Sequence, residues 1–242
     1  MKIGGFQKNS LIDFPKIIAC IIFTQGCNFI CPYCHNPDLV VGSQKEAGSS
    51  IKGQMGARYD EQEIFDFLEK RKGFLEGVVI TGGEPTLQKD LIAFCRKIKG
   101  MGYQLKLDSN GSHPDILAQL FEDRLVDFIS MDIKTSLENY HMIVPRAFDA
   151  EKIHESARLL MEKAPGYEFR TTCCRPFVSK EIMTDIGKMI TGASTYILQK
   201  CSRNVIVLDP EFLKEDQYFF SDGELLELKE VINTYVITAV VR

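Results

Sequence analysis

Short apolar runs alternate with amphipathic segments along most of the chain. The continuous run at 17–23, which reads IIACIIF, is typical of a strand that is buried on both faces of a parallel sheet. Further strands are predicted at 77–81, 103–107, 126–131, 168–173, 195–199 and 235–241. Apolar residues at helical spacing predict a helix that opens at Asp60 and further helices at 90–101, 114–121, 151–163, 180–190 and 224–233.

This alternation of strands and helices indicates βαβ units with right-handed crossovers and a parallel sheet. Six or seven units are too few to close an eight-fold barrel. We therefore expect an α/β fold whose sheet forms a partial, open (β/α)6 barrel of the TIM type. Because no linker, repeat or low-complexity segment interrupts residues 1–242, a single domain is predicted. A polar, glycine- and serine-rich excursion at 42–58 is expected to be flexible.

Composition and charge exclude several classes of protein. The 29 lysines and arginines are outnumbered by 33 acidic residues, giving a net charge of −4, so we expect no nucleic-acid partner. The apolar run at 17–23 is far shorter than the ~20 residues that span a bilayer. The first five residues lack the apolar core of a signal peptide. These features predict a cytoplasmic protein without a membrane segment.

Three of the eight cysteines crowd into one loop, at 25–38, directly after the strand at 17–23. They are Cys27, Cys31 and Cys34, with C-x3-C-x2-C spacing. In a reducing compartment such crowding indicates a metal site rather than disulfides. Structural zinc requires four ligands, and the neighbouring His35 should diverge from Cys34 in an extended loop. A cubane cluster held by three thiolates instead leaves one iron open for chemistry. A zinc-binding interaction module without catalysis is the alternative.

Polar residues also follow the other predicted strands, where ligands collect in parallel α/β sheets. Gly82, Gly83 and Glu84 come after the strand at 77–81. Asp132 and Lys134 are two positions apart, so alternation places both side chains on the interior face. Each feature also has a structural interpretation: a tight turn for the glycines, a local cap for Glu84 and an ion pair for the charged residues.

The cysteine motif, extended to C-x3-C-x-Y-C-H, resembles the signature of the radical S-adenosylmethionine (SAM) superfamily, and 81–85 (TGGEP) resembles its GGEP motif. The resemblance continues in order and spacing. The segments SLIDFP, QGCNF, HNPDL, GEPTLQ, KLDSNG and MDIK are similar to those of activating proteins of anaerobic ribonucleoside-triphosphate reductase and stand at 10–15, 25–29, 35–39, 83–88, 106–111 and 131–134.

This resemblance implies both cofactors and a mechanism. Cys27, Cys31 and Cys34 would hold a [4Fe-4S] cluster whose open iron chelates SAM. One electron, from a flavodoxin- or ferredoxin-type donor, would cleave the sulfonium to methionine and a 5′-deoxyadenosyl radical. The radical would remove a hydrogen from a glycine Cα of the partner, an anaerobic ribonucleoside-triphosphate reductase. Another glycyl-radical enzyme of the pyruvate formate-lyase type, or a small molecule, is the alternative target.

The residues expected to contact SAM come from five places in the chain. We expect them to be Tyr33, His35, Gly82, Gly83, Glu84, Pro85, Asp108, Asn110, Asp132, Lys134 and Arg170. In the family, the GGEP segment meets the amino group of SAM. Tyr33 and His35 are assigned to the adenine side, and Arg170 to the SAM carboxylate.

Two features distinguish this chain within the resemblance. Cys173, Cys174 and Cys201 stand where related activases carry aliphatic or aromatic residues, so we interpret them as small core hydrophobes. The segment 39–59 contains no cysteine, which disfavours activases that carry ferredoxin-like cluster insertions there.

Overall fold

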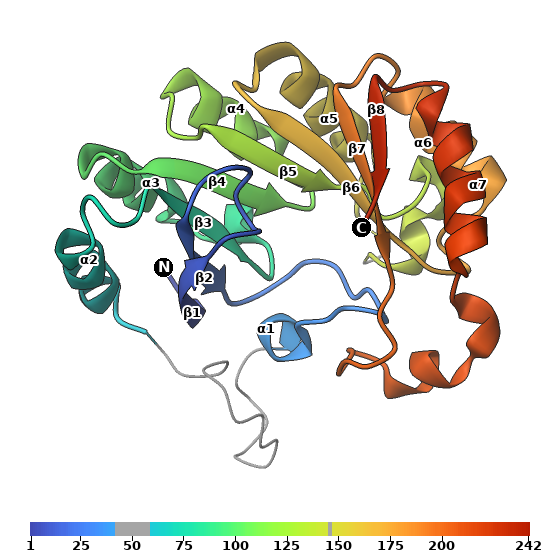
Figure 1. Cartoon of the computed structure of the whole chain (residues 1–242), viewed down its shortest axis with the longest axis horizontal. Coiled ribbons are helices and arrows are strands. Elements are labelled where there is room, and N and C mark those ends of the chain that lie inside the picture. The colour runs from blue at the N-terminus through green and yellow to red at the C-terminus, as the bar shows by residue number, and fades with distance from the viewer. Residues whose placement is uncertain (42–58, 145–146) are drawn as a thin grey trace.

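A computed structural model describes residues 1–41, 59–144 and 147–242. The expected excursion at 42–58 lies outside the described residues, so its predicted flexibility stays a prediction. One sheet of eight strands forms the centre of the molecule, in the order β1 to β8 (Figure 1). The strands are β1 (Ile3–Ser10), β2 (Ala19–Thr24), β3 (Gly77–Gly82), β4 (Gln104–Ser109), β5 (Phe128–Asp132), β6 (Tyr167–Cys173), β7 (Thr195–Lys200) and β8 (Thr238–Val241).

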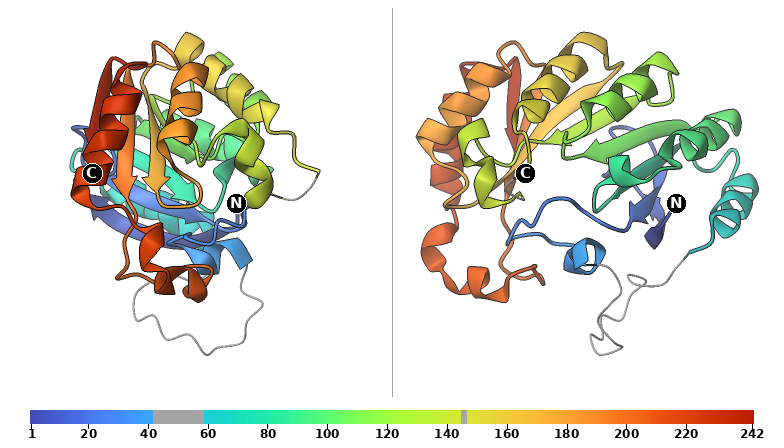
Figure 2. Two further views of the ribbon diagram at one scale, coloured as in Figure 1. Left: turned by 90° about the vertical axis from the view of Figure 1, so that its right-hand side faces the viewer. Right: turned by 180° about the vertical axis from the view of Figure 1, so that it is seen from behind.

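Helices cover the outer face of the curved sheet (Figure 2). The α-helices are α1 (Pro37–Val41), α2 (Glu61–Lys70), α3 (Leu91–Gly100), α4 (Pro114–Glu122), α5 (Glu151–Lys163), α6 (Lys180–Met189) and α7 (Asp222–Asn233). Short 3-10 helices are η1 (Pro85–Leu87), η2 (Leu137–Met142), η3 (Pro210–Lys214) and η4 (Asp216–Tyr218). Among the described residues, no helix is long and apolar enough to cross a membrane.

The parallel part of the sheet confirms the predicted partial barrel. Strands β2 to β8 pair in parallel and in chain order. Each strand from β2 to β7 is followed by one of the helices α2 to α7, which makes six strand–helix units in the described chain. In that same part of the chain β1 and β8 do not pair, so the barrel is open.

Burial on both faces explains why the central strands read as continuous apolar runs. In β2, Ile22 packs into the large core beneath the helices, whereas Ile21 belongs to a second cluster with Phe14 on the opposite face. The helices bury one stripe each. In α2, Ile64 and Leu68 are fully buried four residues apart, and Asp60 caps the first turn by accepting from the backbone N–H of Gln62.

The first and last strands differ most from the sequence prediction. Strand β1 was not predicted, because its two glycines and polar end break the apolar pattern; it pairs antiparallel with β2 at the sheet edge. Register shifts interrupt this pairing at both ends, and Ile3 also forms a bridge with Tyr59. The last strand begins at Thr238 rather than at 235, because the backbone N–H groups of Tyr235 and Val236 still bond to Ile232 at the end of α7.

Candidate functional site

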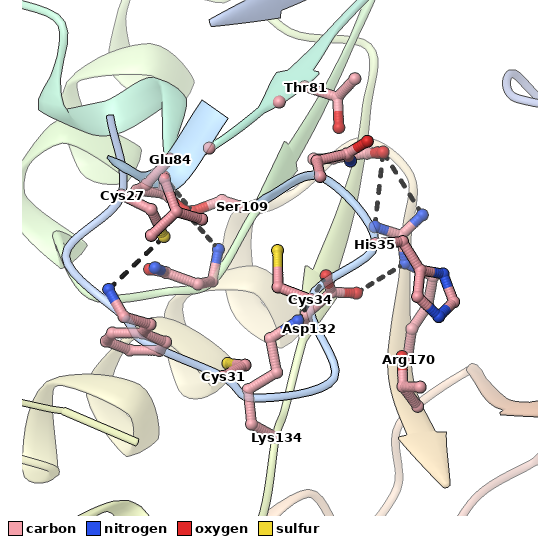
Figure 3. A pocket seen from close by; sticks show the side chains of 18 of the residues that line it. Cys27, Cys31, Cys34, His35, Thr81, Glu84, Ser109, Asp132, Lys134 and Arg170 are labelled. Carbon is pink, nitrogen blue, oxygen red and sulfur yellow. Dashed lines mark hydrogen bonds and ion pairs between the residues drawn. The ribbon is translucent and has the colours of Figure 1, made fainter. Parts of the chain in front are cut away.

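A pocket of about 240 Å³ lies at the carboxyl ends of the parallel strands, between the 25–38 loop and the ends of β3 to β7 (Figure 3). It brings together all but one of the residues predicted to form the site. The predicted residues that line it are Cys27, Cys31, Tyr33, Cys34, His35, Gly82, Gly83, Glu84, Asp108, Asn110, Asp132, Lys134 and Arg170. Pro85 is outside the lining and is buried at the first position of η1.

The pocket also contains residues that were not among the predicted set. These are Phe29, Asn36, Val40, Thr81, Ser109, Thr172 and Gln199. Four of them lie at or next to the carboxyl ends of strands, and this position alone could have indicated that they line the site. They are Thr81 in β3, Ser109 in β4, Thr172 in β6 and Gln199 in β7. Phe29 and Val40 gave no signal because their apolar side chains look like ordinary core residues.

Backbone hydrogen bonds attach the cysteine loop to the glycine segment after β3. The N–H of Gly83 donates to the Thr24 carbonyl at 2.9 Å, and the N–H of Glu84 donates to the Gly26 carbonyl at 2.8 Å. A Cβ on Gly83 would lie 2.0 Å from the Gly26 oxygen. Gly82 has φ +119°, a left-handed value that favours glycine. Glycine is therefore required at both positions, because the two backbone segments that border the pocket lie too close together to leave room for a Cβ.

The three cysteines of the loop are arranged around this pocket (Figure 3). Burial raises the pKa of Cys27 to about 12 and that of Cys31 to about 11, with Lys134 acting in the opposite direction in both cases. Among the described residues, no three His, Cys, Asp or Glu side chains form a group that could hold a single metal ion. Three soft thiol donors from one loop fit an iron–sulfur cluster by their chemistry.

Tyr33 and His35, which flank Cys34, differ in environment. The Tyr33 ring is 3% exposed and packs against Phe177, with ring centroids 5.2 Å apart. Its hydroxyl has no oxygen or nitrogen partner in the described part of the chain and interacts with Cys31. His35 is exposed at the pocket rim and interacts with Cys201.

A network of partly buried charges lines the pocket beside Cys31 and Cys34 (Figure 3). Arg170 Nε donates to Asp132 at 2.8 Å and the guanidinium lies 3.4 Å from Asp108. Lys134 Nζ donates to the other oxygen of Asp132 at 3.0 Å, and Lys106 pairs with Asp108. The predicted alternation of Asp132 and Lys134 is thus confirmed, and the structural interpretation of these residues as ion pairs is also present.

These ion pairs keep the carboxylates charged despite burial. Burial alone would raise the pKa of Asp132, but Arg170 and Lys134 outweigh it and lower that pKa to about 2. Asp108 follows the same pattern: burial opposes ionisation, and Arg170 and Lys106 hold its pKa below the usual value. In return, the carboxylates overcome the effect of burial on Lys134 and Arg170 and raise the pKa of both. The site therefore presents fixed charges of both signs.

Glu84 connects three segments beneath the pocket. Its side chain is 0% exposed and caps η1 by accepting from the backbone N–H of Thr86. The same carboxylate accepts from the Ser109 hydroxyl at 2.9 Å and from the backbone N–H of Asn110 at 2.6 Å. Asn110 in turn donates to Asn28 in the cysteine loop at 2.9 Å. The Thr86 hydroxyl also donates to Glu84, at 2.6 Å. Burial raises the pKa of Glu84, and its four hydrogen bonds, from the Thr86 hydroxyl and N–H, Ser109 and Asn110, act against that rise.

Comparison with known proteins identifies relatives over nearly the whole chain. A family described as the radical SAM superfamily matches residues 21–177. A Methanocaldococcus jannaschii protein named for glycyl-radical enzyme activation is 31% identical over 99% of this chain and 95% of its own length. The pyruvate formate-lyase-activating enzyme of Listeria monocytogenes is 35% identical over 58% of this chain and 56% of that enzyme.

Solved structures support the fold. Streptococcus suis SuiB superimposes with a TM-score of 0.63 at 14% identity, over 92% of this chain and 48% of that protein. A domain of the pyruvate-formate lyase-activating enzyme from Bacteroides vulgatus superimposes with a TM-score of 0.51 at 14% identity, over 69% of this chain and 99% of that domain. At such low identity these matches show the shared α/β partial barrel only.

Proposed function

The chain belongs to the radical SAM superfamily and, within it, to the family of glycyl-radical enzyme activating enzymes, and we propose that it generates the glycyl radical of an anaerobic ribonucleoside-triphosphate reductase. Membership of the superfamily implies a [4Fe-4S] cluster and SAM as cofactors. When bound, these cofactors supply one-electron cleavage of the sulfonium and a carbon radical that can remove hydrogen from a glycine Cα.

The proposed cluster ligands are Cys27, Cys31 and Cys34. This assignment is supported by their position on one loop, by the pocket that all three line and by the chemistry of thiolate donors. The two thiols whose pKa is raised by burial must release their protons to bind iron, so cluster assembly competes with protonation.

The proposed SAM site is the charged side of the pocket. Arg170 and Lys134 offer cations to the carboxylate of SAM, whereas Asp108 and Asp132 offer acceptors to its amino group and ribose hydroxyls. Because each of these groups already has a partner of opposite charge, little reorganisation is needed when a zwitterionic ligand binds.

The remaining predicted contacts hold the ligand in orientation. Gly82 and Gly83 present backbone at the pocket, and the Glu84–Asn110 hydrogen bond fixes the loop after β4 beside it. Tyr33 and His35 are proposed for the adenine side. Pro85 is proposed to have no direct contact with SAM. Instead it fixes the first turn of η1 and thereby the position of Glu84.

The choice of an anaerobic ribonucleotide reductase as target is supported by the order of six matching segments between residues 10 and 134. The absence of cysteine from 39–59 also supports it, since activases of some other glycyl-radical enzymes carry extra clusters there. A flavodoxin- or ferredoxin-type protein is the proposed electron donor. We place the enzyme in the cytoplasm, where reducing conditions suit its free thiols.

A second candidate target is pyruvate formate-lyase. The observation that favours it is the 35% identity to the Listeria monocytogenes enzyme, although that match covers only 58% of this chain.

One anaerobic experiment distinguishes the two targets. The cluster-loaded protein is mixed with SAM, a one-electron reductant and either the reductase or the lyase of the same organism, and electron paramagnetic resonance is recorded. We expect a glycine-centred doublet with the reductase and none with the lyase. SAM cleavage without a doublet on the reductase would refute the proposed target. A Cys31→Ala sample serves as the blank for cofactor-dependent signal.

A further inference from the structure

Cys174 and Cys201 directly follow two neighbouring parallel strands, β6 and β7. The register of β6 with β7 pairs Thr172 with Gln199 and ends on the pair of Cys173 with Lys200, so each cysteine comes one residue after the last pair. Neighbouring strands lie about 4.8 Å apart, which is within the Cα separation that a disulfide can bridge.

The two thiols point to the same side of the sheet. Side chains alternate along a strand, so Cys174 shares a face with Thr172, and Cys201 shares a face with Gln199. Thr172 and Gln199 both line the cofactor pocket, which places the cysteine pair just beyond its wall. Cys173, which is next in sequence, donates instead to the Thr171 carbonyl.

The pair is in direct contact and has an activating neighbour. The Cys174 thiol lies 3.9 Å from the Thr172 carbonyl oxygen, to which it donates, and it also interacts with Cys201, as does His35. These partners, with Cys174 the larger effect, overcome burial and lower the pKa of Cys201 below its usual value. A thiol with a pKa near the ambient pH attacks disulfides most effectively.

Cys201 is also within reach of small solutes, although only 5% of it is exposed. It lines a second pocket, of about 660 Å³, whose other side chains include Lys200, Arg203, Arg242 and Phe219. Three of these are cations, which pair with Asp222, Asp216 and Glu168, and Glu224 also lines the pocket. A lining with charges of both signs suits a zwitterionic reagent. Cys174, by contrast, is fully buried behind Cys201.

We propose that Cys174 and Cys201 are a redox-active dithiol that low-molecular-weight zwitterionic disulfides, such as oxidised glutathione, convert to an intramolecular disulfide. The Cys201 thiolate attacks one sulfur of the reagent, which forms a mixed disulfide and expels one thiolate. Cys174 then loses its proton and attacks the Cys201 sulfur, which expels the second thiolate. The reagent gains two electrons, and the two cysteines lose them. This modification is independent of which enzyme the protein activates.

The test uses the cluster-loaded protein under anaerobic conditions. It is incubated with increasing oxidised glutathione, the remaining thiols are alkylated in acid, and tryptic peptides are analysed by mass spectrometry. Trypsin does not cleave between Arg175 and Pro176, so Cys174 lies in the peptide 171–180 and Cys201 in the peptide 201–203. We expect these two peptides to be joined by a disulfide, with two of the eight thiols lost and iron and sulfide retained.

Three variants assign the chemistry. Cys174→Ser should keep one glutathione on Cys201, because the resolving thiol is gone. Cys201→Ser should lower glutathione uptake at Cys174 at least tenfold. Cys173→Ser is the matched control and should still form the linked peptides, which also shows that Cys174 rather than Cys173 is bonded.

Because Cys173 shares the peptide 171–180 with Cys174, the wild-type map is read from fragment ions that separate the two residues, and it then decides the proposal even if one variant fails to fold. Glutathione that stays on Cys201 while Cys174 remains open to alkylation would overturn it. The same holds if both cysteines remain unmodified, or if the disulfides formed involve Cys27, Cys31 or Cys34 instead.

Discussion

The backbone N–H of Asn110 donates a 2.6 Å hydrogen bond to Glu84, and this bond joins the segments that follow β3 and β4. The Glu84 carboxylate is fully buried and accepts from four donors in total. Since both of its oxygens are used, the charge and the shape of this side chain are both required beneath the pocket.

Glu84→Gln should therefore destabilise the protein. Its amide nitrogen cannot accept a hydrogen bond, so either the Asn110 N–H or the Thr86 and Ser109 donors lose their partner. We expect the free energy of unfolding to fall by about 1–3 kcal/mol, measured by anaerobic denaturant titration. Glu76→Gln, at an exposed position, is the control. Equal unfolding midpoints for the two variants would contradict this role of Glu84.

Gly83→Ala should displace the cysteine loop. The added Cβ would lie 2.0 Å from the Gly26 carbonyl oxygen, and neither backbone segment can move without breaking the hydrogen bonds between them. We expect a loss of about 1–3 kcal/mol in stability and of most of the bound iron after reconstitution. Gly100→Ala is a matched control, because nothing lies within 4 Å of its Cβ and it ends α3. That variant should bind iron normally.

Cys31→Ala should abolish cluster assembly and leave the barrel folded. The residue lies on the loop after β2 rather than in a strand, so the sheet does not depend on it. Iron and sulfide content, together with far-ultraviolet circular dichroism, test both halves of this prediction. Cys95→Ala removes a fully buried thiol of α3 that is remote from the pocket lining, and it should retain full iron content. Normal iron content in Cys31→Ala would refute the ligand assignment.

Arg170→Lys should weaken SAM binding at least tenfold, because lysine keeps the charge but cannot bond Asp132 and Asp108 at once. Arg170→Gln should be worse, since two buried carboxylates would lose the cation they share, at about 3–5 kcal/mol of stability. Anaerobic equilibrium dialysis with labelled SAM measures the first effect. Arg96→Lys, in an exposed ion pair with Asp123, should change neither quantity measurably.

The low pKa of Asp132 makes stability depend on pH in a defined direction. Its pKa is about 2 in the folded protein, below the unfolded value near 3.9. Its contribution, about 2 kcal/mol, is therefore complete above the unfolded pKa and is lost as the pH falls toward 2. The stability difference between wild-type apoprotein and Asp132→Asn should shrink by that amount between pH 5 and pH 2. If the stability difference stayed constant over this range, Arg170 and Lys134 would not lower the pKa of Asp132 in the folded protein.

Much of the fold was predictable because most of its helices and strands each show one clear pattern of apolar residues, either a continuous run or a helical spacing. The run at 17–23 lies within two residues of β2, and the helix predicted at 151–163 coincides with α5. Strand β1 was not predictable in this way, since Gly4 and Gly5 carry no apolar signal and the strand exists through its pairing with β2.

The site was predictable from the position of residues at strand ends, but their interactions were not. Spacing placed Asp132 and Lys134 on one face, yet it could not reveal that Arg170 would bond to Asp132 from the next strand. Cys174 and Cys201 were expected to be packing residues. Their contact depends on the register of β6 with β7, which the separate strand patterns do not contain.

Because the sheet does not close, it has two free margins where unpaired backbone could recruit another chain and start aggregation. Both margins are protected in the described structure. Strand β8 is only four residues long, and β1 has register shifts and a bridge to Tyr59. Such short or irregular margins are poor templates for intermolecular strands. The protein can therefore keep an unclosed barrel without becoming prone to fibre formation.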